Sequence, residues 1–113
     1  YPLASGALSG KYRGGQMPKN ARMTLFKGWE RMINPLALKA YDEYYELAKE
    51  NDITMVQLAQ AFVNSRPFVT SNIIGATTME QLKENIESMN IKLTEEVLEK
   101  INIIHNNNPN PAP

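Results

Sequence analysis

Several features that would assign a chain to a functional class are missing from this sequence. It has no cysteine, which excludes disulfides and thiolate metal sites. Its 12 Lys and Arg balance its 12 Asp and Glu, so it offers no basic field to nucleic acid or to an anionic membrane. No signal segment is visible, and no apolar run reaches the length that spans a bilayer. We therefore expect a cytoplasmic protein with small-molecule or protein partners and no nucleic-acid or membrane partner.

The length of the chain also limits its organisation. Its 113 residues are enough for one small domain, but the first residue is Tyr1 and not methionine. We therefore expect residues 1–113 to be part of a longer protein.

Four stretches have the periodicity of amphipathic helices. Residues 36–50 carry an apolar stripe of Leu38, Tyr41, Tyr45 and Ala48. Residues 54–64 open with a capping box of Thr54 and Gln57 and should be mostly buried. Residues 79–89 follow the cap Thr78, with a predicted buried stripe of Met79, Leu82, Ile86 and Met89. A fourth helix starts at Thr94, with a stripe of Val97, Leu98, Ile101, Ile104 and His105.

Two segments are candidates for β-strands. Residues 68–75, "FVTSNIIG", lack charge and are β-branched, which is typical of a strand buried on both faces. Residues 1–5, "YPLAS", are weakly strand-like. The long connection 13–35 and an irregular tail at 106–113 complete the chain. Strands followed by helices indicate βα repeats, and two strands cannot form a stable parallel sheet, so we expect part of a larger α/β protein.

A glycine-rich loop follows the first candidate strand. Residues 6–15, "GALSGKYRGG", combine glycines that admit an anion with the cations Lys11 and Arg13. They do not form a Walker A loop, because only three residues separate Gly6 from Gly10 and Tyr12 follows Lys11. The alternatives are a phosphate loop of another geometry and a plain surface turn.

A second candidate anion site lies in "IIGATTMEQLKEN". The segment turns after Gly75 and a helix opens at Thr78, so free N–H groups and the positive end of the helix dipole meet there. Gln81, Glu84 and Asn85 share one face of that helix and could meet a purine edge. The alternative is that Gln81 completes a capping box with Thr78, and that the other two side chains are solvated.

Two motifs together resemble a known family. "PLASGALSGKY", then Arg22, and about seventy residues later "RPFVTSNIIGATTMEQLKENI" are similar to the C-terminal portion of aldo-keto reductases, above all the bacterial Tas-like, NADP-dependent branch. The resemblance implies a (β/α)8 TIM barrel, an α/β fold, of which this chain would supply the seventh and eighth βα units and the C-terminal helix. Barrel phosphate sites commonly follow strands seven and eight.

The resemblance also implies a cofactor, NADP(H), with NAD less favoured. The nicotinamide side and pyrophosphate would be held by Pro2, Leu3, Ala4, Gly6, Ser9 and Lys11, and Arg22 would close over them on a strap formed by residues 13–35. The adenosine ribose and its 2′-phosphate would meet Gly75 and Thr77, and the adenine would meet Gln81, Glu84 and Asn85.

The family's catalytic Asp, Tyr, Lys and His belong to earlier strands, so no catalytic residue is expected in this chain. His105 is expected to be structural, and no metal-ligand cluster is present in the sequence. The resemblance implies a parent enzyme that reduces aldehydes or ketones, that needs an N-terminal barrel segment and that could form a homo-oligomer. The alternatives are a non-catalytic NADP-binding regulatory subunit and an inactive remnant.

Overall fold

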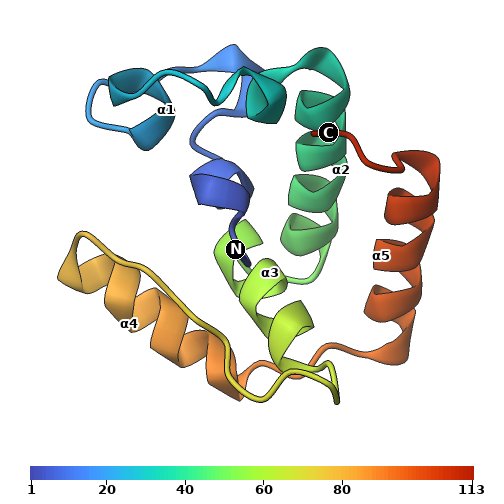
Figure 1. Ribbon diagram of the computed structural model, residues 1–113. Coiled ribbons are helices and arrows are strands. Elements are labelled where there is room, and N and C mark those ends of the chain that lie inside the picture. The colour runs from blue at the N-terminus through green and yellow to red at the C-terminus, as the bar shows by residue number, and fades with distance from the viewer.

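The computed structural model describes residues 1–113, and all of its regular elements are helical (Figure 1). The α-helices are α1 (Arg22–Leu25), α2 (Pro35–Glu50), α3 (Met55–Asn64), α4 (Met79–Glu87) and α5 (Glu95–Asn107). Four short 3-10 helices are η1 (Ala4–Ser9), η2 (Arg13–Gly15), η3 (Glu30–Ile33) and η4 (Ser88–Asn90). None of the helices combines the length and apolarity needed to cross a membrane.

Helix α2 confirms the first predicted helix and begins one residue earlier. Asn34 caps it, since its side-chain oxygen accepts the N–H groups of Leu36 and Ala37 at 2.8 and 3.0 Å. Pro35 occupies the first turn, where its missing N–H costs nothing. The buried face includes Tyr41 and Ala48, as predicted.

Helix α3 confirms the predicted capping box. Thr54 Oγ1 accepts the Gln57 N–H at 3.1 Å, and Gln57 Oε1 accepts the Thr54 N–H at 2.9 Å. The helix is mostly buried, as its composition predicts. Gln60 is buried too, at 1% exposure, although the sequence places it on a polar stripe.

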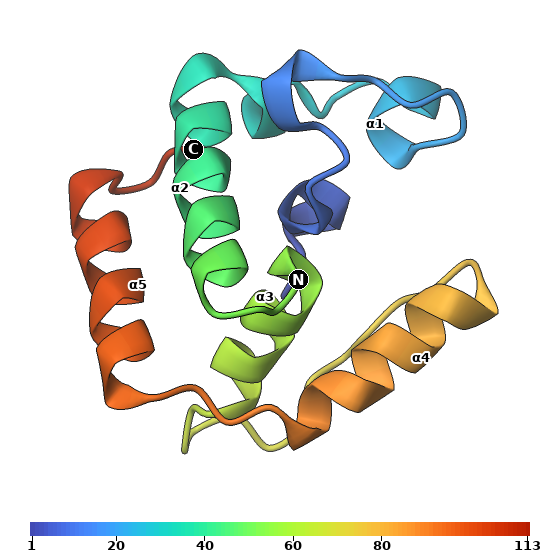
Figure 2. The same ribbon diagram turned by 180° about the vertical axis from the view of Figure 1, so that it is seen from behind.

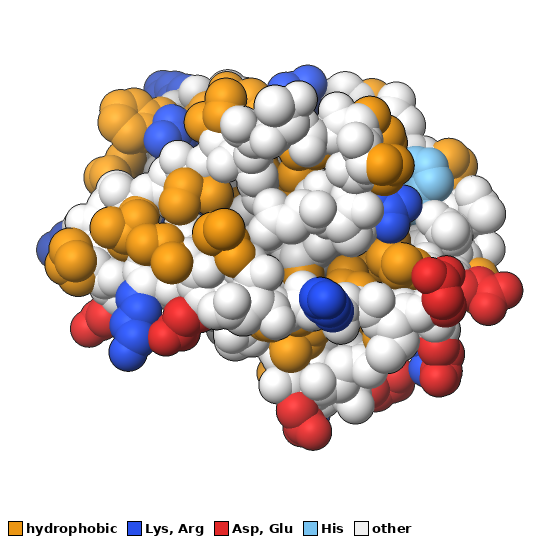
Figure 3. Space-filling view, turned by 90° about the horizontal axis from the view of Figure 1, so that it is seen from below, with side chains coloured by type: hydrophobic (Ala, Val, Ile, Leu, Met, Phe, Trp, Pro, Cys, Tyr) orange, Lys and Arg blue, Asp and Glu red, His pale blue; other side chains and the backbone are white.

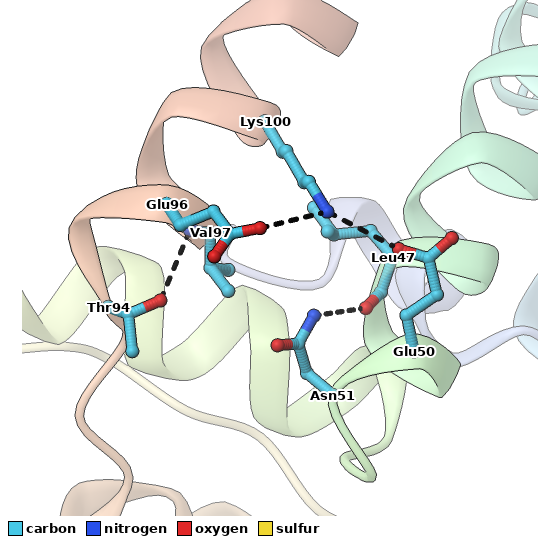
Figure 4. Close-up of polar contacts among 7 residues, drawn as sticks. All are labelled: Leu47, Glu50, Asn51, Thr94, Glu96, Val97 and Lys100. Carbon is cyan, nitrogen blue, oxygen red and sulfur yellow. Dashed lines mark hydrogen bonds and ion pairs between the residues drawn. The ribbon is translucent and has the colours of Figure 1, made fainter.

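Helix α5 packs along α2 and confirms the fourth predicted helix. Its buried residues are Val97 and Ile101, each of which contributes about 1.5–3 kcal/mol by leaving water. Figure 4 shows Lys100 pointing from α5 toward α2, with its ammonium 3.4 Å from Glu96 and 3.7 Å from Glu50. The helix continues to Asn107, so the irregular tail starts later than the predicted residue 106. His105 is exposed in the last turn, so its predicted place on the apolar stripe is wrong.

The two predicted strands do not form, and those predictions are wrong for this chain. Residues 71–76 have no regular structure; residues 2 and 3 form a turn, and Ala4 and Ser5 already belong to η1. A strand needs a neighbour to complete its hydrogen-bond ladder, and no segment here provides one. Phe68 and Ile73 are accordingly exposed, at 81% and 86%. The helices of the expected βα pattern are therefore present, but its strands are not.

The predicted buried stripe of α4 is also wrong. Met79, Ile86 and Met89 are 77%, 52% and 74% exposed, while Asn85 and Ser88 are buried. Helix α4 packs on α3 through this more polar edge, because there is no sheet for its apolar face to cover. Figure 3 shows hydrophobic side chains gathered over the region of α4. The helix itself ends at Glu87, and η4 completes the predicted range 79–89.

Candidate functional site

The loop Pro2–Lys11 has an unusual backbone. Ala4, Ser5 and Gly6 have φ angles of 47°, 59° and 95°, three left-handed residues in succession. Only Gly6 adopts such a conformation without cost; for Ala and Ser it costs roughly 1–2 kcal/mol each. Ser9 Oγ donates a hydrogen bond of 2.7 Å to the Gly6 carbonyl and steadies the turn. Strain of this kind is often retained where a loop has a binding role.

Lys11 folds back over this loop. A Cβ added to Gly6 would lie 3.1 Å from Lys11 Cε and 3.3 Å from Lys11 Nζ, closer than side chains normally approach. The absence of a side chain at Gly6 therefore leaves the space that Lys11 occupies. The Lys11 ammonium also lies 5.6 Å from the centre of the Tyr12 ring. The loop thus presents a half-buried cation beside a tight backbone turn, an arrangement suited to an anion.

The predicted strap, residues 13–35, folds into η2, α1 and η3. Arg13 anchors its start to α2, with an ion pair of 2.9 Å to Asp42 and its guanidinium 3.4 Å from the centre of the Tyr45 ring. Arg22 is exposed, and its guanidinium lies 5.9 Å from the Trp29 ring. Among the large apolar residues of the strap, Met23 is buried and Trp29 is half-buried, while Met17, Leu25 and Phe26 are exposed.

The second candidate loop precedes α4. Thr78 caps the helix, and its hydroxyl oxygen accepts the Gln81 N–H at 3.2 Å. Gln81 Oε1 accepts bonds from the Thr77 N–H at 2.8 Å and the Thr77 hydroxyl at 3.1 Å. The side chain of Gln81 therefore acts as a cap, but it reaches Thr77 and not Thr78. Apart from its two chain neighbours, no residue lies within 4 Å of a Cβ built on Gly75, so its backbone is open to a ligand.

Glu84 and Asn85 face α3. Asn85 is 4% exposed; its Oδ1 accepts Gln60 Nε2 at 2.9 Å and its Nδ2 donates to the Gly75 carbonyl at 3.1 Å. Glu84 Oε1 accepts the Thr54 hydroxyl at 2.6 Å. The alternative of a fully solvated face is therefore wrong for Asn85. Contact of either residue with an adenine stays a prediction.

Asn72 belongs to the same polar network, although it is not among the predicted site residues. Its Nδ2 donates to Gln60 Oε1 at 2.7 Å and to Asn64 Oδ1 at 3.0 Å. Its own Oδ1 is buried without a partner, which is costly. The signal in the sequence is an amide inside an otherwise apolar, β-branched run. Through these contacts α3 holds the segment that leads to Gly75.

The two candidate loops lie on an open surface. Figures 1 and 2 show α1 and the first turn of α4 on the same side of the molecule, with η1 nearer the middle. Two surface hollows lie elsewhere, one between α2 and α5 and one on the outer face of α4, and neither includes a predicted site residue. Further walls would be needed to enclose a cofactor between the loops.

Two tyrosines of α2 have shifted pKa values. Burial raises the pKa of Tyr41, and burial together with Glu43 raises the pKa of Tyr44, so both phenols remain protonated at neutral pH. No three His, Cys, Asp or Glu side chains converge to hold a metal ion.

Residues 1–106 match the aldo/keto reductase family, and the chain belongs to this family. It is 43% identical over 111 residues to Protein tas of Escherichia coli K12, covering 98% of this chain and 32% of that protein. It is 34% identical over 114 residues to a probable voltage-gated potassium channel subunit beta of Oryza sativa subsp. japonica, covering 96% and 34%. To L-glyceraldehyde 3-phosphate reductase of Escherichia coli K12 it is 34% identical over 94 residues, covering 79% and 27%.

The chain therefore spans about a quarter to a third of the length of these relatives. The likeness to Protein tas supports the predicted relation to the Tas-like branch of the family.

Proposed function

We propose that residues 1–113 form the NADP(H)-binding C-terminal part of an aldo-keto reductase barrel. They would provide its seventh and eighth βα units and its C-terminal helix, with the strand segments 1–5 and 68–75 paired to strands from the preceding sequence. The family membership and the order of the helices support this placement. The exposed apolar side chains of Phe68, Ile73 and Met79 support it as well, because a sheet would cover them.

The residues of the two loops fit such a cofactor. Beside the left-handed turn at Gly6, Lys11 offers a cation suited to the pyrophosphate, and the exposed Arg22 offers a second. Pro2, Leu3, Ala4 and Ser9 would line the nicotinamide side. The open backbone at Gly75, with Thr77 and Gln81 at the N-terminus of α4, suits the 2′-phosphate. Glu84 and Asn85 would lie nearest the adenine.

Within the intact protein, this chain would bind and orient the cofactor. When bound, the reduced nicotinamide would supply a hydride to the carbonyl carbon of an aldehyde or ketone. Lys11 and Arg22 would fix the pyrophosphate, and the strap would shield it from water. The proton for the carbonyl oxygen would come from the family's tyrosine on an earlier strand, since no group here is placed to donate it. We propose a cytoplasmic enzyme, with homo-oligomer formation open to test.

The observation that carries this proposal is the Lys11 side chain folded over Gly6 in a member of the aldo/keto reductase family. Calorimetric titration of the intact protein with NADPH tests it, using Lys11→Ala and the matched control Lys92→Ala, an exposed lysine that lies between η4 and α5, outside both loops. A charge-assisted bond contributes about 1.5–3 kcal/mol, so Lys11→Ala should raise the Kd at least tenfold. An unchanged Kd, with the control also unchanged, would contradict the assignment.

A regulatory NADP-binding subunit is the second candidate, favoured by the likeness to the Oryza potassium channel subunit beta. Turnover distinguishes the two. The enzyme would oxidise NADPH in the presence of a panel of aldehydes and ketones, whereas tight NADPH binding without turnover would favour the regulatory role. Absence of NADPH binding by the intact protein would favour an inactive remnant.

A further inference from the structure

Tyr12 is fully buried. It is not among the residues proposed to bind the cofactor, so the proposed site gives its hydroxyl no role. The phenolic oxygen accepts a hydrogen bond of 3.1 Å from the backbone N–H of Met23, eleven residues further along the chain. This bond closes the first half of the strap into a loop. Residues 14–20 of that loop are exposed, so the loop has few other contacts that fix its return.

This hydrogen bond joins two residues that each follow a cation in the sequence. Lys11 directly precedes Tyr12, and Arg22 directly precedes Met23. Ala21 and Met23, on either side of Arg22, are both 6% exposed, while Arg22 itself is exposed. The backbone at Arg22 is therefore held from both sides and its side chain is free to reach a ligand.

A second anchor fixes the other side of Tyr12. Arg13 pairs with Asp42 at 2.9 Å and stacks on Tyr45, so the chain at residues 12 and 13 is tied to α2. Tyr12 is thus held firmly, and the hydrogen bond to its hydroxyl fixes the start of α1 relative to it. If Lys11 and Arg22 are held in place before the cofactor binds, binding does not have to pay the entropy cost of ordering them.

We propose that Tyr12 is a positioning residue whose buried hydroxyl holds Arg22 in register with Lys11, so that the two cations bind one diphosphate together. This inference rests on the proposed function, because it assigns Lys11 and Arg22 to the pyrophosphate. It adds a residue that touches no part of the cofactor and acts only through Arg22.

A double-mutant cycle tests the inference in the intact protein. Tyr12→Phe removes one oxygen and keeps the ring, so the packing around it is preserved. Calorimetric titration with NADPH would compare wild type, Tyr12→Phe, Arg22→Ala and the double variant. We expect Tyr12→Phe to raise the Kd three- to tenfold, and to add nothing once Arg22 is absent. Tyr44→Phe, a half-buried phenol of α2, is the matched control and should leave the Kd unchanged.

A second ligand separates positioning from general loosening of the fold. Adenosine 2′-monophosphate carries the adenosine and 2′-phosphate of the cofactor without either phosphate of the pyrophosphate, so its Kd should be the same in Tyr12→Phe and wild type. Equal losses for both ligands, an additive loss in the double variant, or an unchanged NADPH Kd in Tyr12→Phe would each overturn the inference. Failure of the wild-type protein to bind NADPH would refute the proposed function itself, and this inference with it.

Discussion

Replacing Gln81 with Glu separates the two roles of this side chain. In the structure Gln81 Oε1 accepts bonds from the Thr77 N–H and hydroxyl at 2.8 and 3.1 Å. A carboxylate keeps both acceptor positions and makes the bonds charge-assisted. It also places a negative charge in the first turn of α4, which the helix dipole favours by about 0.3–1 kcal/mol. The melting temperature of the intact protein should therefore hold or rise by a few degrees.

The same carboxylate should oppose a 2′-phosphate. Two unit charges about 5 Å apart repel by about 3 kcal/mol at an effective dielectric constant of 20, before screening by salt. Each 1.4 kcal/mol corresponds to a tenfold change in Kd, so the NADPH Kd should rise by roughly tenfold to a hundredfold. NADH lacks this phosphate, and its Kd should change much less.

The assay is calorimetric titration of wild type and Gln81→Glu with both cofactors, alongside thermal unfolding. Gln81→Leu is the matched control: it removes the acceptor for Thr77 without adding charge, so stability should fall while no repulsion appears. Unchanged binding of both cofactors by Gln81→Glu would show that Gln81 is only a cap. The assignment of this loop to the 2′-phosphate would then lose its best-defined member.

Three further predictions concern the strap and the chain alone. Arg22→Ala in the intact protein should raise the NADPH Kd at least tenfold, because it removes a charge-assisted contact; titration checks this, and equal affinity would argue against the strap. Residues 1–113 alone should not oxidise NADPH with any aldehyde, because the family's catalytic residues are expected on earlier strands; measurable carbonyl-dependent turnover would contradict this. The same chain, with Phe68, Ile73 and Met89 exposed, should bind a hydrophobic dye or self-associate; a monodisperse monomer with a cooperative thermal transition would contradict that expectation.

The helices could be predicted because their signals are local. Asn34, Thr54, Thr78 and Thr94 each cap the backbone a few residues away, and each helix begins directly after its cap. Periodicity also identified the buried faces of α2 and α5, since both helices pack within this chain. Helix propensity and caps are sufficient to predict a helix and its buried face where the surface that the helix packs against lies in the same chain.

The strands and the face of α4 could not be predicted in this way. "FVTSNIIG" has the composition of a buried strand, but strand formation depends on a neighbour far away in sequence or absent from it. The apolar stripe of α4 is visible in the sequence, but its periodicity does not indicate which surface the stripe covers. The buried amides of Gln60, Asn72 and Asn85 gave no local signal because their partners lie on different segments.

The candidate site was partly predictable. Gly6 could be singled out because glycine adopts a positive φ without cost, and Gly75 because a residue without a Cβ leaves the backbone open at a turn. The inward orientation of Asn85 and the bond from Met23 to Tyr12 depend on tertiary packing, and no spacing rule contains them.

A crystal structure of the intact protein with NADP⁺ bound tests the central claim most directly. We predict the pyrophosphate against Lys11 and Arg22, and the 2′-phosphate at the N-terminus of α4 beside Gly75, Thr77 and Gln81. A cofactor bound away from both loops, or no cofactor at saturating concentration, would contradict the claim that residues 1–113 form the NADP(H)-binding part of the protein.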